Sequence, residues 1–175
     1  AIEQAKQGEV NAQRMLGYMY ETHFEHEKAF YWFNKAVEQG DVQSTSALGN
    51  LYFSGNGVPE DIEKALQLFK KAAKQGDASG QYFLAMSYEI SNINNDPIVW
   101  NNASIYYRFS ANQGNILAQF RLGEMHLYGT GVDKSFKVAA FWINLVRNNS
   151  IYPEENRTKK EAEKLWHKYE LSKYE

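Results

Sequence analysis

The sequence predicts an all-α fold built as a linear array of helix pairs, and two observations predict it. First, a glycine recurs at Gly8, Gly40, Gly76 and Gly114, at spacings of 32, 36 and 38 residues. Second, the positions between these glycines agree from copy to copy, which is the signature of a repeat architecture. Each copy holds two segments with the apolar periodicity of a helix, and one such pair cannot bury its own apolar face. The copies must therefore stack against one another as a solenoid.

The first helix of each copy carries its agreeing positions four residues apart, which places them on one helix face. Its leucine column consists of Leu16, Leu48, Leu84 and Leu122. An aromatic column follows four residues later and consists of Tyr20, Tyr52, Tyr88 and His126. The second helix repeats one alanine, at Ala29, Ala65, Ala103 and Ala139. Large apolar residues follow it three and four positions on, as Trp32 and Phe33 do in the first copy, so this helix also has one apolar face.

The most regular copy carries a specific pattern of glycines, charges and aromatic residues. It reads Leu48-Gly49, Tyr52, Gly55-Asn56-Gly57-Val58, Asp61, Lys64-Ala65 and Lys71-Ala72-Ala73-Lys74-Gln75-Gly76. This pattern resembles the Sel1-like repeat, a relative of the tetratricopeptide repeat, and the resemblance covers about residues 8–150. The resemblance implies a right-handed α-solenoid of antiparallel helix pairs that acts as an adaptor or scaffold.

The register divides the chain into four copies, and we expect a single repeat domain over residues 1–175. The copies span about residues 8–39, 40–75, 76–113 and 114–149. Residues 1–7 are expected to form a helix end that shields the first copy. Asn56-Gly57 is expected to form a positive-φ turn between the two helices of the second copy, and the fourth copy regains this turn. The third copy departs most, because residues 90–102 replace this turn.

A capping helix is expected at about residues 153–171. Pro153, Glu154 and Glu155 suit the first turn of a helix, because a proline is tolerated there and acidic side chains favour the helix dipole. An apolar stripe follows at Ala162, Leu165, Trp166 and Tyr169. Such a helix closes the apolar end of a solenoid. Its aromatic residues could alternatively form a dimer contact, so an oligomer through the end caps stays open.

Composition excludes several classes of function. A net charge of −2 argues against a dedicated nucleic-acid surface. The absence of cysteine excludes disulfides and thiolate metal sites. No segment reaches the ~18 apolar residues of a membrane span. The compartment stays open between a bacterial cytoplasm and periplasm, since any signal peptide would lie outside this chain.

No catalytic, metal-binding or cofactor-binding residue is predicted. His23 and His26 lie among acidic residues and could suggest a metal site, but zinc sites normally need three or four ligands, so a solvated turn is favoured. His126 takes a place in the aromatic column, which favours a hydrogen-bonded packing residue over a catalytic one. Gly129-Thr130-Gly131 lacks the strand and the lysine of a phosphate loop.

The predicted binding residues are first-helix positions that vary between the copies. Since the repeated columns are needed for packing, the varying positions are free to contact a partner on a concave face. These candidates are Arg14, Tyr18, Asn50, Phe83, Met86, Arg121 and Glu124. Ile93 and Trp100 are candidates for a docking loop; the favoured alternative is that Ile98 and Trp100 fold back over the interhelical gap.

These observations favour a non-catalytic scaffold that binds another protein or a peptide. A narrower alternative is a bacterial immunity or antitoxin protein that neutralises a secreted toxin effector. An enzyme such as a hydrolase is the competing class, but the sequence shows no nucleophile next to a base. A structural module that assembles through its end caps is the third class.

Overall fold

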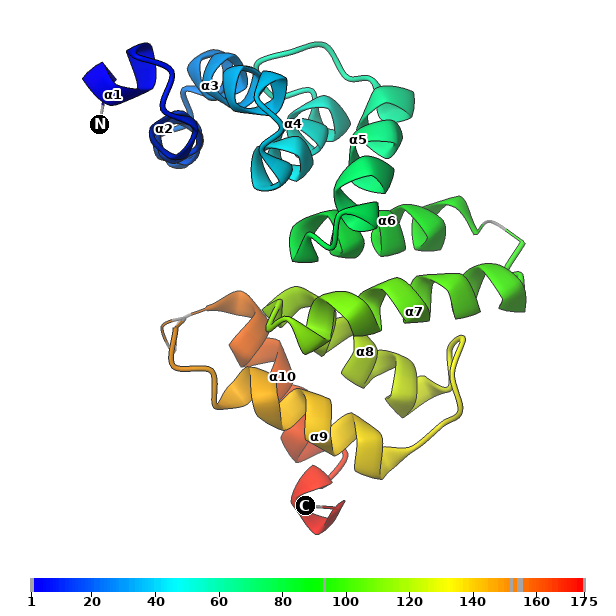
Figure 1. Cartoon of the computed structure of the whole chain (residues 1–175). Helices are drawn as coiled ribbons and strands as arrows, with labels where there is room; N and C mark the ends of the chain where they lie inside the picture. The colour runs from blue at the N-terminus through cyan, green and yellow to red at the C-terminus, as the bar shows by residue number, and fades with distance from the viewer. Residues whose placement is uncertain (1, 93, 152, 154–155, 175) are drawn as a thin grey trace. The chain divides into compact units, whose positions relative to one another are not determined.

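The computed structural model describes residues 2–92, 94–151, 153 and 156–174. Every regular element in these residues is a helix (Figure 1). The helices are α1 (Ile2–Lys6), α2 (Val10–Thr22), α3 (His26–Glu38), α4 (Val42–Ser54), α5 (Ile62–Lys74), α6 (Ala78–Ser91), α7 (Pro97–Asn112), α8 (Ile116–Tyr128), α9 (Phe136–Arg147), α10 (Arg157–Lys168) and the 3-10 helix η1 (Leu171–Tyr174). The predicted all-α solenoid of helix pairs is confirmed, since each copy contributes two helices in the expected order.

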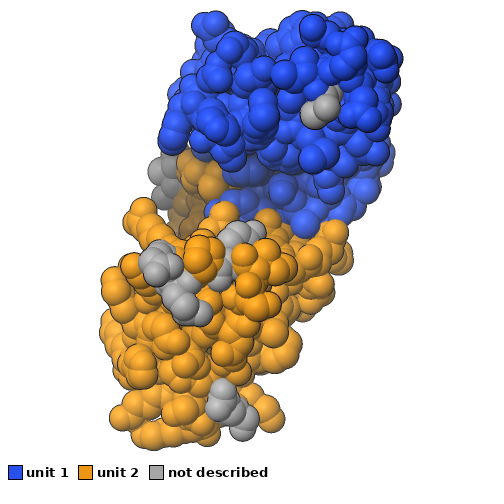
Figure 2. Space-filling model, turned by 90° about the vertical axis from the view of Figure 1, so that its left-hand side faces the viewer, with its two compact units in different colours: residues 1–84 blue, residues 85–175 orange. Residues whose placement is uncertain are grey.

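The chain divides into two compact units, residues 1–84 and residues 85–175, which Figure 2 shows in different colours. In the first unit, α2 packs on α3, α3 on α4, and α4 on α5. In the second unit, α7 packs on α8, α8 on α9, and α9 on α10. Within each unit, these helices therefore contact their neighbours in the chain, as expected of a repeat array. The single domain over residues 1–175 stays a prediction.

The predicted apolar columns form the core of both units. All four residues of the leucine column are at most 3% exposed. The second-helix column that begins at Phe33 is also buried throughout, at Phe33, Phe69, Tyr107 and Ile143. Burying each such side chain stabilises the fold by about 1.5–3 kcal/mol. The packing positions were thus identified correctly from the sequence.

The glycine at the end of each copy ends one helix and leads into the next. Gly40 has a φ of +88°, a left-handed conformation that closes α3, and the next amide, of Asp41, donates to the Ala36 carbonyl at 3.0 Å. The Asp41 carboxylate then accepts from the Ser44 amide at 2.8 Å and caps α4. Gly76-Asp77 and Gly114-Asn115 repeat this arrangement.

The glycine turn predicted between the helices of a copy is confirmed, and it packs on the preceding copy. Gly57 has the predicted positive φ, and so does Gly55, whereas the prediction of positive φ at Asn56 was wrong. A Cβ on Gly57 would lie 2.4 Å from the carbonyl carbon of His26, the first residue of α3. In the second unit, a Cβ on Gly131 would lie 2.6 Å from the carbonyl carbon of Trp100, near the start of α7. The second glycine of the turn therefore allows two backbones of successive copies to touch.

The third copy keeps more helix than the sequence predicted. Pro97 begins α7, and the Asp96 carboxylate caps it by accepting from the Ile98 amide at 2.8 Å. The side chain of Ile98 is 71% exposed, so the prediction that it folds back over the interhelical gap was wrong. Trp100 lies within α7, not in a loop, and its Nε1 donates to Asn95 at 2.6 Å. Ile93 lies outside the described residues.

The two ends of the chain carry the expected shielding helices, with a shift in the second. Residues 2–6 form α1, whose Ala5 is buried. The predicted start of the cap at Pro153 was wrong, because Asn156 caps the helix by accepting from the Thr158 amide at 2.9 Å and α10 begins at Arg157. The predicted first-turn acids, Glu154 and Glu155, lie outside the described residues.

The apolar stripe of α10 covers α9 within the second unit. Ala162 and Trp166 are buried in the cluster that contains Ile143 and Val146. The guanidinium of Arg147 lies 4.1 Å from the ring centroid of Trp166. The Trp166 ring is therefore packed inside the fold, and the oligomer through the end caps stays a prediction.

Candidate functional site

Three of the predicted partner-binding residues meet in one pocket of the first unit, which we call the α2–α4–α6 pocket. It has a volume of about 170 Å³. Its lining residues come from the first helices of three successive copies and are Tyr18, Glu21, Ser46, Ala47, Asn50, Ser79 and Phe83. Tyr18, Asn50 and Phe83 were predicted from the sequence, and all three lie here.

The aromatic walls of this pocket are held in place by rings behind them. Tyr18 contacts Phe33 edge-on, with ring centroids 5.0 Å apart. Phe83 stacks on Phe69 at 4.9 Å with an interplanar angle of 16°. Because Phe33 and Phe69 are fully buried core residues, the two walls are fixed before any ligand arrives. The side chain of Tyr18 is still 39% exposed, so its ring is available for contact.

The charge around the pocket is negative. Burial, together with the negative charges of Asp77 and Glu21, raises the pKa of the Tyr18 phenol to about 12. Arg14 acts in the opposite direction and Asp41 adds to the increase. The phenol therefore stays neutral at physiological pH and lies next to several carboxylates.

Glu21 was missed by sequence reasoning, although it lies in the pocket. Burial raises the pKa of its carboxyl, while the positive charge of His26 and a hydrogen bond from Asn50 act against that increase. The signal was present in the sequence, because the third copy has a glutamate, Glu89, at the same register position. Glu21 was not predicted because it is neither aromatic nor at one of the first-helix positions chosen as variable.

Arg14 lies beside the pocket and bonds within the fold. One guanidinium nitrogen lies 2.7 Å from the Asp41 carboxylate, and the other donates to Asn11 at 2.8 Å. Since Asp41 also caps α4, Arg14 ties α2 to the start of the next copy. Its predicted role in partner binding stays a prediction.

In the second unit, Arg121 and Glu124 belong to an ion-pair network on the first-helix positions. Arg121 pairs with Glu124 at 2.6 Å and with Glu89, which also accepts a hydrogen bond from the Tyr107 hydroxyl at 2.8 Å. Burial lowers the pKa of the Arg121 guanidinium, but the two carboxylates outweigh burial and hold the pKa above its ordinary value. Arg121 is therefore a charged bridge between α6 and α8. Met86 lies half-buried on α6.

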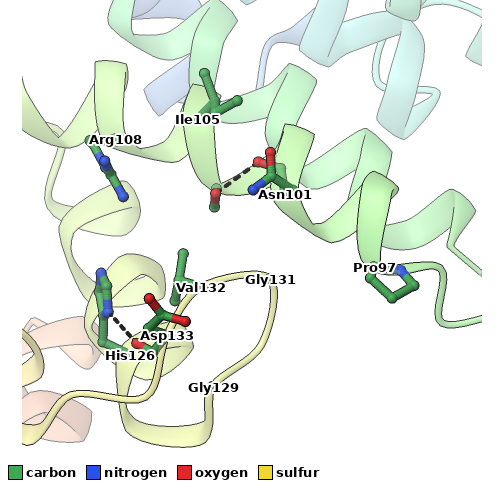
Figure 3. A pocket seen from close by; sticks show the side chains of 10 residues that line it. Pro97, Asn101, Ile105, Arg108, His126, Gly129, Gly131, Val132 and Asp133 are labelled. Carbon is green, nitrogen blue, oxygen red and sulfur yellow. Dashed lines mark hydrogen bonds between the residues drawn. The ribbon is translucent and has the colours of Figure 1, made fainter.

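The second unit has a larger, shallow pocket of about 630 Å³ between α7 and the α8–α9 connector (Figure 3). Arg108 faces His126 and Asp133 across it. The Nδ1 of His126 donates to the Asp133 carbonyl at 3.0 Å, since a carbonyl can only accept. Ser104 donates its hydroxyl to the Asn101 carbonyl at 2.7 Å. His126 is buried and hydrogen-bonded, as predicted for a packing residue.

The two histidines of the candidate metal site lie on either side of the short connector between α2 and α3. His23 bonds through Nδ1 to the Met19 carbonyl at 2.7 Å, at the end of α2. His26 begins α3. In the part of the chain that the structure describes, no group of three or more histidine, cysteine or acidic residues is placed to hold a metal ion. Among the same residues, no helix has the length and apolarity to span a membrane.

A family model described as Sel1 repeat matches residues 10–22, 25–41, 42–77 and 116–145, which together are more than half of the chain. These segments correspond to the first, second and fourth copies. Most of the third copy lies outside them, which agrees with its departure from the repeat pattern. The break after residue 22 coincides with the short connector that lacks the glycine turn.

Two solved structures resemble the chain along most of its length. A protective antigen of uropathogenic Escherichia coli with an SLR fold is 29% identical, with a TM-score of 0.74 over 97% of this chain. A Sel1 repeat protein from Oxalobacter formigenes is 29% identical, with a TM-score of 0.72 over 85% of this chain. The chain spans 37% and 61% of these two proteins, less than two thirds of either.

Proposed function

The chain belongs to the Sel1 repeat family, and on this premise we propose that it is a non-catalytic scaffold whose α2–α4–α6 pocket docks a segment of a partner protein. Repeat arrays of this kind present extended surfaces on which other proteins bind. The proposal assigns the docking role to the first unit. It assigns Arg121 and Glu124 of the second unit a role in holding helices together.

One observation carries the proposal: first-helix residues of three successive copies converge on one pocket. Tyr18, Asn50 and Phe83 occupy positions that the repeat pattern leaves variable, yet they line the same space. Aromatic side chains on a preformed surface are typical of interface hot spots. The pocket's volume of about 170 Å³ is below the roughly 300–1,000 Å³ of small-molecule sites. It suits one anchoring side chain of a protein partner.

A capture experiment with two matched double variants tests this proposal. Tyr18→Ala/Phe83→Ala removes both aromatic walls. Phe24→Ala/Tyr31→Ala removes one phenylalanine and one tyrosine of the same unit that lie outside the pocket and are more than half exposed. A partner captured by the wild type is expected to be retained by the second variant and lost from the first. Its direct affinity is then measured with the purified partner.

Circular dichroism and thermal melts of both variants check the fold, because Phe83→Ala also removes the stacking on Phe69. If that variant is unfolded, the single variant Tyr18→Ala replaces it. A partner that binds the pocket variant as tightly as the wild type would refute the docking site. A captured toxin effector would narrow the role to that of an immunity protein.

A further inference from the structure

We propose that the α2–α4–α6 pocket receives an arginine side chain of the partner, whose guanidinium pairs with Glu21 between the rings of Tyr18 and Phe83. This inference rests on the proposed function, since it names the chemistry of the docked segment. In the second unit of the same chain, the repeat itself supplies an arginine to a glutamate at the equivalent position.

The second unit shows what a glutamate at this register position binds. Glu89 of α6 pairs with the guanidinium of Arg121, which comes from the first helix of the following copy. The same guanidinium pairs with Glu124, one turn further along α8, at 2.6 Å. An arginine thus lies between two first helices and is held by a carboxylate from each.

The first unit has a similar frame without the arginine, in which Phe33 takes the place of Tyr107 and has no hydroxyl to donate to Glu21. In the repeat register, Glu21 occupies the position of Glu89, and Ala47 occupies the position of Arg121. Asn50 stands in place of Glu124, and its side chain acts to lower the pKa of the Glu21 carboxyl. The short side chain of Ala47 leaves the space open, and Ala47 lines the pocket. The pocket therefore corresponds in the repeat register to the site at which the second unit holds the guanidinium of Arg121.

The chemistry of the pocket fits a guanidinium from outside. Glu21 is partly buried, and the positive group that acts on its carboxyl is the imidazole of His26, which is charged only when protonated. A partner arginine would supply a permanent charge and up to two hydrogen bonds to this carboxylate. Its planar group also stacks on aromatic rings, which lysine does less well, and Tyr18 and Phe83 provide such rings.

Selection from a random peptide library separates this inference from the proposed function. The library is panned on the full chain and counter-selected on Tyr18→Ala/Phe83→Ala. Pocket-dependent peptides that share one arginine support both proposals. Pocket-dependent peptides without a shared arginine, or with a shared lysine, keep the docking site and overturn the arginine assignment. If no pocket-dependent peptide emerges, the docking site is refuted as well.

A double-mutant cycle on a selected peptide then tests the pair directly. Glu21→Gln is expected to weaken binding by about tenfold or more, as removal of one member of a desolvated ion pair does. Replacing the peptide arginine by glutamine should weaken binding to the wild type similarly and cost little more on Glu21→Gln. Glu63→Gln, an exposed glutamate of α5, is the matched control and should leave the affinity unchanged. Additive losses in the cycle would contradict a Glu21–arginine pair.

A second variant fills the pocket from within. Ala47→Arg gives the first unit the residue that the second unit has at the equivalent position, so its guanidinium should pair with Glu21. We expect binding of the selected peptide to fall at least tenfold while the melting temperature stays at or above that of the wild type. Undiminished peptide binding by a folded Ala47→Arg variant would overturn the inference. If Ala47→Arg does not fold, the cycle with Glu21→Gln decides alone.

Discussion

The carboxylate of Glu21 lowers the stability of the unbound fold, although the proposed binding of a guanidinium requires it. Its carboxyl is partly withdrawn from water, and burial raises its pKa. A raised pKa means that the folded state binds a proton more tightly than the unfolded state does. The free energy of unfolding then falls as pH rises from the ordinary pKa of a glutamate through the raised pKa of the folded state. At neutral pH this residue therefore destabilises the unbound protein.

Replacing Glu21 by glutamine should accordingly raise the melting temperature at pH 7. The amide keeps the hydrogen-bonding shape without the charge, so the variant lacks the unfavourable burial of a carboxylate. Below pH 4, where the wild-type carboxyl is protonated in both states, the two melting temperatures should converge. Thermal melts from pH 3.5 to pH 8 measure this, with Glu63→Gln as the exposed control. A lower melting temperature for Glu21→Gln at pH 7 would show that its carboxylate stabilises the fold.

The arginines show how residue type alone can mislead about a binding surface. Arg14 and Arg121 lie on first helices and vary between copies, which made them candidates. In the structure, Arg14 bonds to Asp41 and Arg121 bonds to Glu89 and Glu124. Each guanidinium joins two successive copies, so its positive charge is already paired with carboxylates of this chain. Their part in partner binding stays a prediction.

At the level of elements, glycine is required at different positions of the repeat for different physical reasons. Gly40 ends a helix with a φ of +88°, and a Cβ there would meet no atom within 4 Å. Gly57 also has a positive φ, but a Cβ there would overlap the backbone of His26. Gly40 is needed only because the backbone there adopts a left-handed conformation. Gly57 is needed for its conformation and for the close approach of the preceding copy.

Alanine substitutions at these two glycines should therefore differ in cost. Gly40→Ala is expected to lower the free energy of unfolding by about 1 kcal/mol, the strain of a left-handed alanine. Gly57→Ala should lower it by about 3 kcal/mol, because the turn must also move away from α3. Urea denaturation of both variants measures the difference. Equal losses would mean that the turn relaxes freely and that its contact with His26 contributes little.

At the level of the whole molecule, the sequence predicted the repeats better than the site. The register, the buried columns and the glycine turns follow from short-range rules that act identically in every copy, so four copies reinforce one another. The third copy and the cap are each represented once, and there the prediction misplaced Ile98 and the start of α10. Tyr18, Asn50 and Phe83 were chosen as variable positions. That they share one pocket depends on how successive helices pack, which the sequence does not state.

Glu21 is the pocket residue that was hardest to predict from the sequence. A glutamate on a helix is ordinarily a solvated residue, and nothing in its own copy marks it. A binding role for Glu21 is suggested only by the structure, in which Glu89 pairs with Arg121 in the second unit. Ala47 occupies the register position of Arg121 in the first unit. The proposed arginine binding therefore rests on the ion pair of the second unit, and not on the residue types of the first unit alone.

Site-specific photo-crosslinking in the source cells tests the central claim most directly. A photoreactive phenylalanine analogue is placed at Tyr18 in one variant and at Tyr31, an exposed tyrosine of α3, in the other. We expect irradiation to join one partner protein to the chain from position 18 and not from position 31. The crosslink should disappear when Ala47→Arg is added. A crosslink to the same partner from position 31, or none from position 18, would contradict docking in the α2–α4–α6 pocket.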